Sequence, residues 1–419
     1  MRGGINMKLR NNATTRWIFV IVISILGIGM IISYYSFDYS KKEKIKILQD
    51  NLSKMQNKEN VPLEILSKGE MKKDTPVGQW LYKDQMLIED KDGIYVYDSI
   101  SKKRTKIDES KNVSGHLFFI SRDGKQIFIP LLTPNEQETS YYIYNVITGE
   151  KKYGSNLPFL FHGGFDETGR YITVGNGTCN ENELVIIDTE DGKTNSIDLK
   201  KFDLKLNLKP GNNTNITNVF SEDGKDIYFI INVWGNGDYI DVLFKYSVNN
   251  PQSVEQVMQF PNNGDYMRRY DIINKGESII FRGKCNGQEG IFVYSIKKKT
   301  ITRVIPNAQE KENNFKDYDY IISKDKSKIV YGVRRGEESG VGKYDIYAAK
   351  LVGEKISNSI CVLENMPSVF NPVRGRDSGW NIDGKKVIVS LSEVDNKTPG
   401  SMFRSYISFI YYNYMITIK

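Results

Sequence analysis

Apolar and polar residues alternate with a period of two through most of the chain beyond residue 76. In the segment "FSEDGKDIYFI" (220–230), Ile227 and Phe229 alternate with Asp226 and Tyr228 after an Asp-Gly-Lys sequence. Such alternation is typical of a β-strand, and Asp-Gly between two apolar runs predicts a type I′ hairpin, in which both central residues have positive φ. The pattern recurs, with substitutions, at 80–90, 119–129, 164–174, 272–281, 322–331 and 380–389. We therefore expect a hairpin at each of these seven places.

A second pair of strands follows each hairpin. The third strand reads like "GIFVYS" (290–295), and a polar turn leads to a fourth strand, the last of which is "YMITIK" (414–419). Four-stranded units repeated at about 49 residues predict a β-propeller, in which each blade covers the apolar face of its neighbour. The expected class is all-β, a seven-bladed propeller over 76–419, with blades starting near 78, 115, 157, 214, 265, 316 and 368. Six blades is the alternative, because the copy at 80–90 is weak.

The recurring phrase resembles the WD40-like (PD40-type) repeat of TolB-like propellers, and it is similar to the propellers that precede prolyl oligopeptidase-type hydrolases. Ser221, Asp223, Gly224, Lys225 and Phe229 carry the match best. The Pro that usually follows the Ser is missing from every copy, "NKGES" lacks the Asp-Gly pair and "SKDKSK" lacks the Gly. The resemblance implies the propeller fold and leaves the ligand open. We expect no hydrolase domain, because the pattern of the final strand reaches the end of the sequence.

The uncharged segment "WIFVIVISILGIGMIISYYSF" (17–37) predicts a single transmembrane helix. Its 21 residues are enough to cross a hydrocarbon core, and Trp17, Tyr34 and Tyr35 suit the two membrane interfaces. A cleaved signal peptide is the main alternative, but the apolar run is long for one and no Ala-x-Ala-like site follows; a buried core helix is the other. Lys and Arg tie on the two flanks. The head, 1–16, resembles a signal n-region, so we expect it in the cytoplasm, with the propeller on the extracytoplasmic side of the cell membrane.

Residues 38–75 are expected to form a short helical stalk and a linker. Ile45, Leu48, Leu52 and Met55 fall at 3-4-3 spacing, the seam of an amphipathic helix. A juxtamembrane helix and a coiled coil are both compatible with so short a seam. A polar run, "SKGEMKKDTP" (67–76), leads into the propeller.

The charge distribution argues against a nucleic-acid partner. Residues 1–75 hold 13 Lys and Arg against 7 Asp and Glu, which accounts for +6 of the formal net charge of +7. The propeller is therefore nearly neutral, whereas a nucleic-acid footprint needs a sustained basic face. The abundance of Lys, Asn and Ile suits an AT-rich bacterial genome.

The sequence offers no recognisable catalytic or metal motif. A Gly-x-Ser-x-Gly elbow, a His-Glu-x-x-His pair, a Walker A loop and an EF-hand loop are all missing. There are two histidines, and the three cysteines, Cys179, Cys285 and Cys361, form no Cys-x-x-Cys pair. We therefore expect no enzyme, no cofactor and no metal.

Long connections between the second and third strands are the best candidates for a binding surface. They occur at 130–140, 175–183, 231–241, 334–345 and 392–403, and in a four-stranded blade they emerge on the face that also carries the links between blades. Loops on a rigid scaffold commonly carry binding. An aromatic loop tip, Trp234, beside Arg334 and Arg335 would suit a contact surface; the alternative is that the Trp caps its blade and the arginines are solvated or paired. The candidate residues are Trp234, Asn236, Asp238, Arg268, Arg269, Arg334 and Arg335.

Three functional hypotheses follow. The first is a membrane-anchored, non-enzymatic binding or scaffold module for a protein or cell-envelope ligand. The second is a propeller enzyme, lyase- or hydrolase-like, with a channel site made of scattered carboxylates. The third is an accessory subunit of a membrane complex.

Overall fold

The computed structural model describes most of the propeller. The described residues are 46–48, 63–72, 78–109, 118–131, 139–157, 160–176, 183–198, 209–210, 217–221, 223–235, 238–248, 250–260, 264–305, 318–338, 341–368, 372, 379–394 and 409–419. Ile47–Lys419 form one compact unit and Met1–Lys46 another. The predicted head and the predicted transmembrane segment, 17–37, lie outside the described residues. In the part of the chain that is described, no helix has the length and apolarity needed to span a bilayer.

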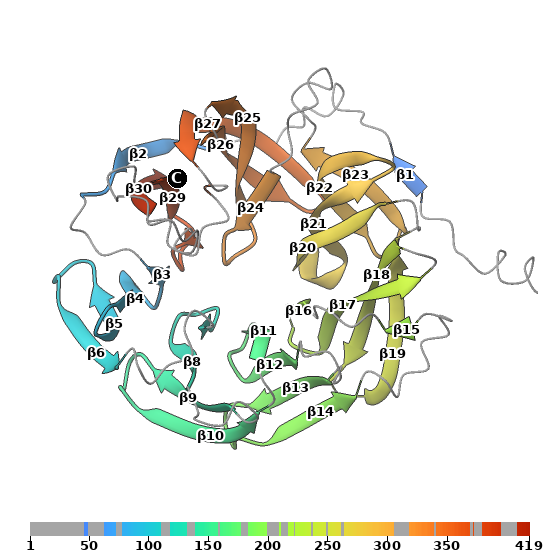
Figure 1. The fold of residues 1–419 in the computed structure, drawn as a ribbon, viewed down its shortest axis with the longest axis horizontal. Helices are drawn as coiled ribbons and strands as arrows, with labels where there is room; N and C mark the ends of the chain where they lie inside the picture. Colours follow the sequence, from blue (N-terminus) through green and yellow to red (C-terminus); the bar gives the residue numbers. More distant parts are fainter. Residues whose placement is uncertain are drawn as a thin grey trace, which may run out of the picture. The chain divides into compact units, whose positions relative to one another are not determined.

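The unit Ile47–Lys419 is a seven-bladed β-propeller (Figure 1). Its strands form seven antiparallel sheets, one for each repeat. The predicted blade count is confirmed, and the six-bladed alternative is wrong. The weak copy at 80–90 belongs to a complete four-stranded blade. Its residues Trp80, Leu87 and Ile88 are buried against the neighbouring blades.

The strands follow the chain blade by blade from the axis outward. Blade 1 contains β3 (Gln79–Trp80), β4 (Gln85–Asp90), β5 (Gly93–Asp98) and β6 (Arg104–Asp108). Blade 2 contains β7 (Phe119–Ile120), β8 (Gln126–Pro130), β9 (Thr139–Asn145) and β10 (Lys151–Leu157). Blade 3 contains β11 (Leu160–Phe165), β12 (Tyr171–Asn176), β13 (Glu183–Asp188) and β14 (Thr194–Asp198). Blade 4 contains β16 (Thr217–Phe220), β17 (Asp226–Gly235), β18 (Asp238–Ser247) and β19 (Asn250–Gln259), with β15 (Lys209–Pro210) beside β17.

The last three blades follow the same plan. Blade 5 contains β20 (Tyr266–Ile273), β21 (Ser278–Cys285), β22 (Gln288–Ser295) and β23 (Thr300–Ile305), with a 3-10 turn, η3 (Asn274–Gly276), between its first two strands. Blade 6 contains β24 (Tyr318–Ile322), β25 (Lys328–Glu338), β26 (Val341–Val352) and β27 (Lys355–Ser368). Blade 7 contains β28 (Gly379–Trp380), β29 (Lys386–Val394), β30 (Phe409–Ile418) and β2 (Ile65–Glu70).

The outer strand of blade 7 comes from the opposite end of the sequence. The sheet order is β2-β30-β29-β28, so the predicted fourth strand at 414–419 is wrong: these residues continue β30, and β2 is the fourth strand. The amide of Lys419 donates to the carbonyl of Glu64 at 2.9 Å, and Leu63 is only 5% exposed. The ring therefore closes through residues that were expected to be stalk and linker, and the propeller begins before residue 76.

The expected helical stalk is not observed among the described residues. Leu48 belongs to a short strand, β1 (Lys46–Leu48), in the sheet of β23. The other seam positions, Ile45, Leu52 and Met55, lie outside the described residues. An apolar residue such as Leu48 serves a sheet edge as well as a helix, and a seam of four positions is too short to decide between them.

The recurring Asp-Gly phrase forms a wider turn than predicted. Only the Gly of each pair has positive φ, as in Gly124 at +69° and Gly224 at +68°, so the type I′ prediction is wrong. In blade 2, Ser121 Oγ donates to Asp123 Oδ1 at 2.8 Å and accepts from the amide of Gln126 at 2.9 Å. These bonds, one between two side chains and one from the backbone to a side chain, stabilise a four-residue turn in place of a two-residue one. Blades 4 and 6 repeat the arrangement with Ser221 and Ser323.

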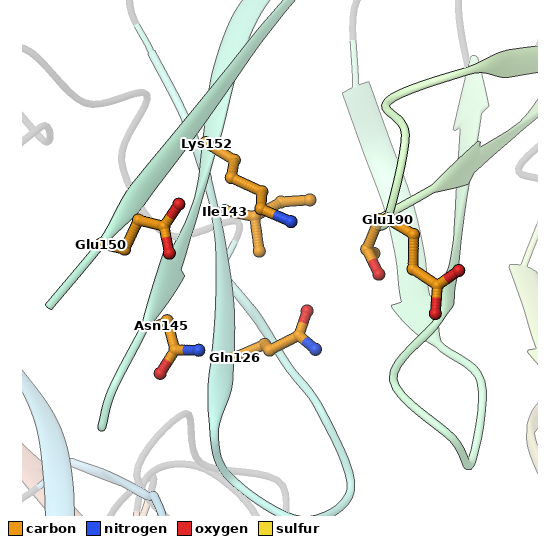
Figure 2. A pocket seen from close by; sticks show the side chains of 7 residues that line it. Gln126, Ile143, Asn145, Glu150, Lys152 and Glu190 are labelled. Atoms are coloured by element: carbon orange, nitrogen blue, oxygen red, sulfur yellow. The ribbon is translucent and has the colours of Figure 1, made fainter. Parts of the chain in front are cut away.

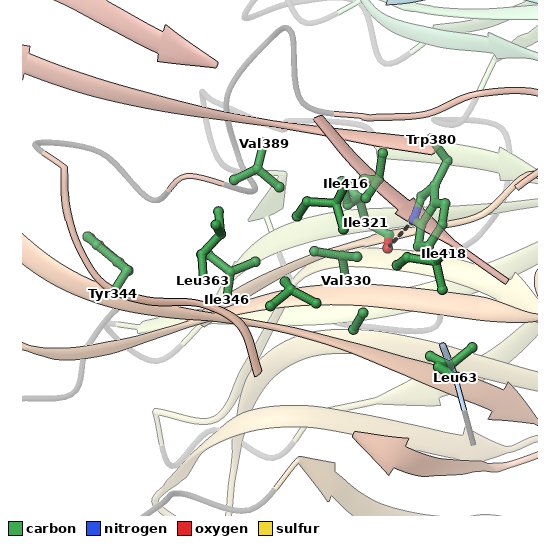
Figure 3. Packing of buried hydrophobic residues seen from close by; sticks show 13 residues of the cluster. Leu63, Ile321, Val330, Tyr344, Ile346, Leu363, Trp380, Val389, Ile416 and Ile418 are labelled. Carbon is green, nitrogen blue, oxygen red and sulfur yellow. Dashed lines mark hydrogen bonds between the residues drawn. The ribbon is translucent and has the colours of Figure 1, made fainter. Parts of the chain in front are cut away.

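The hydrophobic core lies between the blades, as the alternation of buried residues requires. Between blades 6 and 7 it includes Ile346, Val389 and Ile416, and the indole of Trp380 donates to the carbonyl of Ile321 at 3.2 Å (Figure 3). Leu63 packs on the same cluster. Each fully buried aliphatic side chain contributes about 1.5–3 kcal/mol, so the interfaces between blades hold the ring together.

Candidate functional site

Within the predicted loop at 231–241, the described residues 231–235 and 238–241 continue the strands β17 and β18. Trp234 lies within β17, opposite Tyr239 of β18 and Lys209 of β15, and Asp238 pairs with Gly235. The prediction of Trp234 at a loop tip is therefore wrong. Asn236 lies outside the described residues. The sequence signal that was overlooked is Asn-Gly at 236–237, because this pair between β-forming residues predicts a hairpin.

Blade 6 has a similar extension. β25 and β26 pair from Lys328↔Lys350 to Glu338↔Val341, so the predicted connection at 334–345 is also largely strand. Arg334 lies opposite Tyr344, and its Nε donates to the carbonyl of Gly336 at 3.4 Å. Arg335 Nε lies 2.6 Å from Asp345 Oδ2, and its Nη2 donates to the hydroxyl of Tyr347 at 2.6 Å. The guanidinium of Arg335 is thus already paired within its own blade.

Arg268 and Arg269 lie on β20, the innermost strand of blade 5, at a register shift between Met267 and Arg269. Arg269 Nη1 lies 3.2 Å from Asp319 Oδ1 on the innermost strand of blade 6, and its guanidinium is 5.4 Å from the ring centre of Tyr320. Arg269 therefore bridges two blades.

The predicted site residues do not form one cluster in the described structure. Arg269 is on an innermost strand, Arg334 and Arg335 are on a second strand, and Trp234 is in another blade. The two extended hairpins do share one property: both belong to connections between second and third strands, which leave each blade on the same face.

A group of charged residues that the sequence reasoning missed lies at the central axis of the propeller. Lys326 Nζ of the β24–β25 turn lies 2.9 Å from Glu167 Oε1 of the β11–β12 turn, and Arg122 of the β7–β8 turn donates to Glu167 Oε2. Blades 3 and 6 are three places apart in a ring of seven, which is the largest possible separation. An ion pair between them must therefore cross the axis. We call Arg122, Glu167, Lys324 and Lys326 the axial cluster.

Lys326 occupies a position where the turns of blades 2, 3, 4 and 7 have glycine, whereas the β3–β4 turn of blade 1 has Lys83 at φ +56°. Gly124, Gly169, Gly224 and Gly384 all have φ between +65° and +76° at this point of the turn, and Lys326 has φ +57°. A side chain in the left-handed region costs about 1–2 kcal/mol relative to the right-handed one. The sequence signal for this feature was the missing Gly in "SKDKSK" (323–328). The lysine that replaces it, Lys326, places its side chain at the axis.

Lys324 adds a further cation to the same place. Burial, the largest influence, lowers the pKa of Lys324, while the nearby carboxylate of Glu167 opposes this and Arg122 reinforces it. Asp271 of β20 is also close, and burial raises its pKa against the opposing influence of Arg269 and Lys326. The charges therefore interact in surroundings where water screens them only in part.

A small crevice lies between blades 2 and 3 (Figure 2). It has a volume of about 150 Å³ and is lined by Gln126, Ile143, Asn145, Glu150, Lys152, Thr189 and Glu190. Ligand pockets for small molecules usually have about 300–1,000 Å³, so the crevice is too small for such a ligand. Among the described residues, no group of three or more His, Cys, Asp and Glu is arranged to hold a metal ion.

No family model matches the chain, and no curated protein matches it. Among solved structures, prolyl endopeptidases share 11% identity at a TM-score of 0.50, with 82% of this chain and 50% of theirs covered. TolB from Acinetobacter baumannii shares 14% at a TM-score of 0.40, with 64% and 61% covered. The tricorn protease shares 13% at a TM-score of 0.48, with 80% and 33% covered.

The chain thus spans less than two thirds of each of these three structures, down to a third of the tricorn protease. At identities of 11–14% the similarity concerns the fold and does not extend to activity or partners. The expected propeller, similar in kind to those of TolB and of the propeller-bearing peptidases, is confirmed by the seven sheets of Ile47–Lys419.

Proposed function

We propose that this protein is a membrane-anchored binding or scaffold module whose propeller, on the extracytoplasmic side, holds a protein or cell-envelope ligand. The single observation that supports this best is the pair of hairpins, β17–β18 and β25–β26, that run beyond the ends of their neighbouring inner strands. β25 and β26 have 11 and 12 residues, whereas β24 beside them has 5. These hairpins lie on one face of the ring, where β29–β30 also continues past the end of β28, and they offer a surface for a macromolecule.

Site-specific photo-crosslinking tests this surface. A photoreactive residue at Trp234 or Arg334 in the full chain should capture a partner in intact membranes. The matched control is the same residue at Tyr153, which is 69% exposed on the outer strand β10. Equal capture from Tyr153, or none from either hairpin, would contradict the proposal.

The proposed anchor and orientation need their own test. The segment 17–37 is expected to hold the chain in the membrane, with the propeller accessible to protease added outside sealed cells. Protection of the propeller in sealed cells, followed by digestion after lysis, would place it on the other side.

An enzyme with a channel site is the second candidate, and a specific group of residues favours it. Asp271 and Asp319, on the innermost strands of blades 5 and 6, lie beside Arg269 and Tyr320. A buried carboxyl with a raised pKa is a common feature of catalytic acids. Loss of a measured turnover in Asp271→Asn, with unchanged crosslinking from the hairpins, would favour this candidate. The third hypothesis is an accessory subunit of a membrane complex. In that case the chain would crosslink to its partner through residues 17–75 and not through the two hairpins.

A further inference from the structure

The axial cluster lies on the face opposite the projecting hairpins. Turns between first and second strands leave each blade on one face, and connections between second and third strands leave on the other. Arg122, Glu167 and Lys326 all belong to turns of the first kind. Any site here is therefore distinct from the surface proposed above.

The cluster has more cations than its carboxylate can neutralise. Arg122 and Lys326 both contact Glu167, whose side chain is 16% exposed, as is that of Lys326. Lys324 has no ion-pair or hydrogen-bond partner among the described residues, and its exposure is intermediate. Two further carboxylates are close to it, Asp123 and Asp271; Asp123 is paired with Lys125 at 3.0 Å, and Asp271 also interacts with Arg269 and Lys326. The ammonium of Lys324 is thus the cation of the cluster that is left for a second anionic group.

The side chain of Lys326 is the second reason to assign a role to this cluster. Positive φ alone does not distinguish this residue, because Lys83, Lys102, Lys275 and Lys299 also have φ between +52° and +61°. What distinguishes Lys326 is that its ammonium reaches the carboxylate of Glu167 in a blade three places away. The turn thus holds a cation at the axis, where the glycine of four other blades would leave none.

We propose that the axial cluster is a binding site for the carboxylate group of an acidic peptide segment. Glu167 already occupies the position between Arg122 and Lys326, which shows that their spacing suits a carboxylate. An incoming carboxylate would pair with Lys324 and compete with Glu167 for Arg122 and Lys326. Charge-assisted hydrogen bonds of this kind are about twice as strong as neutral ones.

Binding of a fluorescein-labelled hexaglutamate peptide to the full chain, followed by fluorescence anisotropy, tests the proposal. Lys324→Ala should weaken binding about tenfold, which corresponds to the loss of one charged contact. The matched control is Lys225→Ala, a lysine of the corresponding turn in blade 4 that pairs with Asp223 and is 65% exposed. Equal binding by wild type and Lys324→Ala, or equal weakening by both variants, would overturn the proposal.

Two further variants separate binding from a structural role. Lys326→Gly should keep or raise the melting temperature, because glycine suits the positive φ, while it weakens binding about tenfold. Glu167→Gln should strengthen binding, because it removes the internal competitor. A Lys326→Gly protein that binds like wild type, or a Glu167→Gln protein that binds more weakly, would show that the cluster only braces the ring.

Discussion

The hydroxyl of Tyr320 donates a hydrogen bond to the carbonyl oxygen of Ile280 at 3.0 Å, from the innermost strand of blade 6 to the second strand of blade 5. Tyr270 repeats this relationship with the carbonyl of Tyr228, one blade earlier. One blade later, the indole of Trp380 donates to the carbonyl of Ile321, which lies on the innermost strand of blade 6. Three successive blades are thus connected to their predecessors by a polar group within an apolar interface.

Removal of this hydroxyl should destabilise the ring. Tyr320→Phe removes a buried hydrogen bond to the carbonyl of Ile280, which keeps its partner within the sheet, and one such bond contributes about 0.5–1.5 kcal/mol. Urea unfolding of the wild type and of the variant measures the difference in their free energies of unfolding. Tyr153→Phe is the control, because Tyr153 is 69% exposed and the change should stay within about 0.5 kcal/mol. Equal stability of Tyr320→Phe and wild type would show that the bond contributes nothing.

Closure of the ring can be tested with two leucines near one strand. Leu63 is 5% exposed and packs between blades 6 and 7, whereas Leu66, in β2, is 55% exposed. Leu63→Ala should lower the free energy of unfolding by about 2–4 kcal/mol through lost burial and a residual cavity. Leu66→Ala should change it by less than about 0.5 kcal/mol. The idea that these residues close the propeller fails if the two variants are equally stable.

The cost of a Cβ in the recurring turn can be separated into backbone and packing parts by comparison with a glycine of another turn. Gly192, in the β13–β14 turn, has φ +72° and open space where a Cβ would lie, so Gly192→Ala should cost about 1 kcal/mol for the backbone alone. Gly224 has φ +68°, and a Cβ there would lie 2.7 Å from Asp166 Oδ2. Gly224→Ala should therefore be more destabilising, by about 2–3 kcal/mol in thermal or urea unfolding. A smaller loss of stability in Gly224→Ala than in Gly192→Ala would mean that the side chain of Asp166 moves away from the new Cβ at little cost.

Cys361 should be a slow nucleophile at neutral pH. Burial, followed by the nearby carboxylates of Asp345 and Glu364, raises the pKa of Cys361 to about 11. The thiolate is the reactive form, so the alkylation rate should rise about tenfold per pH unit from pH 8 towards 11. Iodoacetamide labelling of a Cys179→Ser, Cys285→Ser protein, in which Cys361 is the remaining thiol, measures this rate. A plateau beginning near pH 8.5, the ordinary pKa of about 8.5 for a thiol, would show that Cys361 is not shifted.

The sequence pattern predicted the fold because each blade repeats a period-two alternation. Ile227 and Phe229 face a neighbouring blade and are buried, as alternation with Asp226 requires. The strand that closes the ring could not be found in this way. "ILSKGE" in β2 is mostly exposed, with no alternation to detect, and its partner, β30, is remote in sequence. Only the requirement that blade 7 needs a fourth strand points to it.

The candidate site was less predictable, because it depends on distances that a sequence does not contain. Lys326 and Glu167 belong to different repeats, and nothing in either turn indicates that they meet. The departure of "SKDKSK" from the repeat was visible, but its meaning depended on φ at Lys326 and on the axial position of the turn. The extended hairpins were read as loops because polar residues such as Asn232 and Arg335 interrupt the apolar alternation, while backbone pairing continues past them.

The mixed origin of blade 7 also sets an order of events during synthesis. β2 emerges from the ribosome before every other strand of its sheet, and its partner β30 emerges last. Until then β2 presents unpaired backbone groups, the kind of strand edge that favours aggregation. The earlier blades can form as they are synthesised, but the propeller cannot close until β30 has been translated and pairs with β2. Until that point the exposed edge of β2 must be covered by other contacts of the nascent chain or by a chaperone.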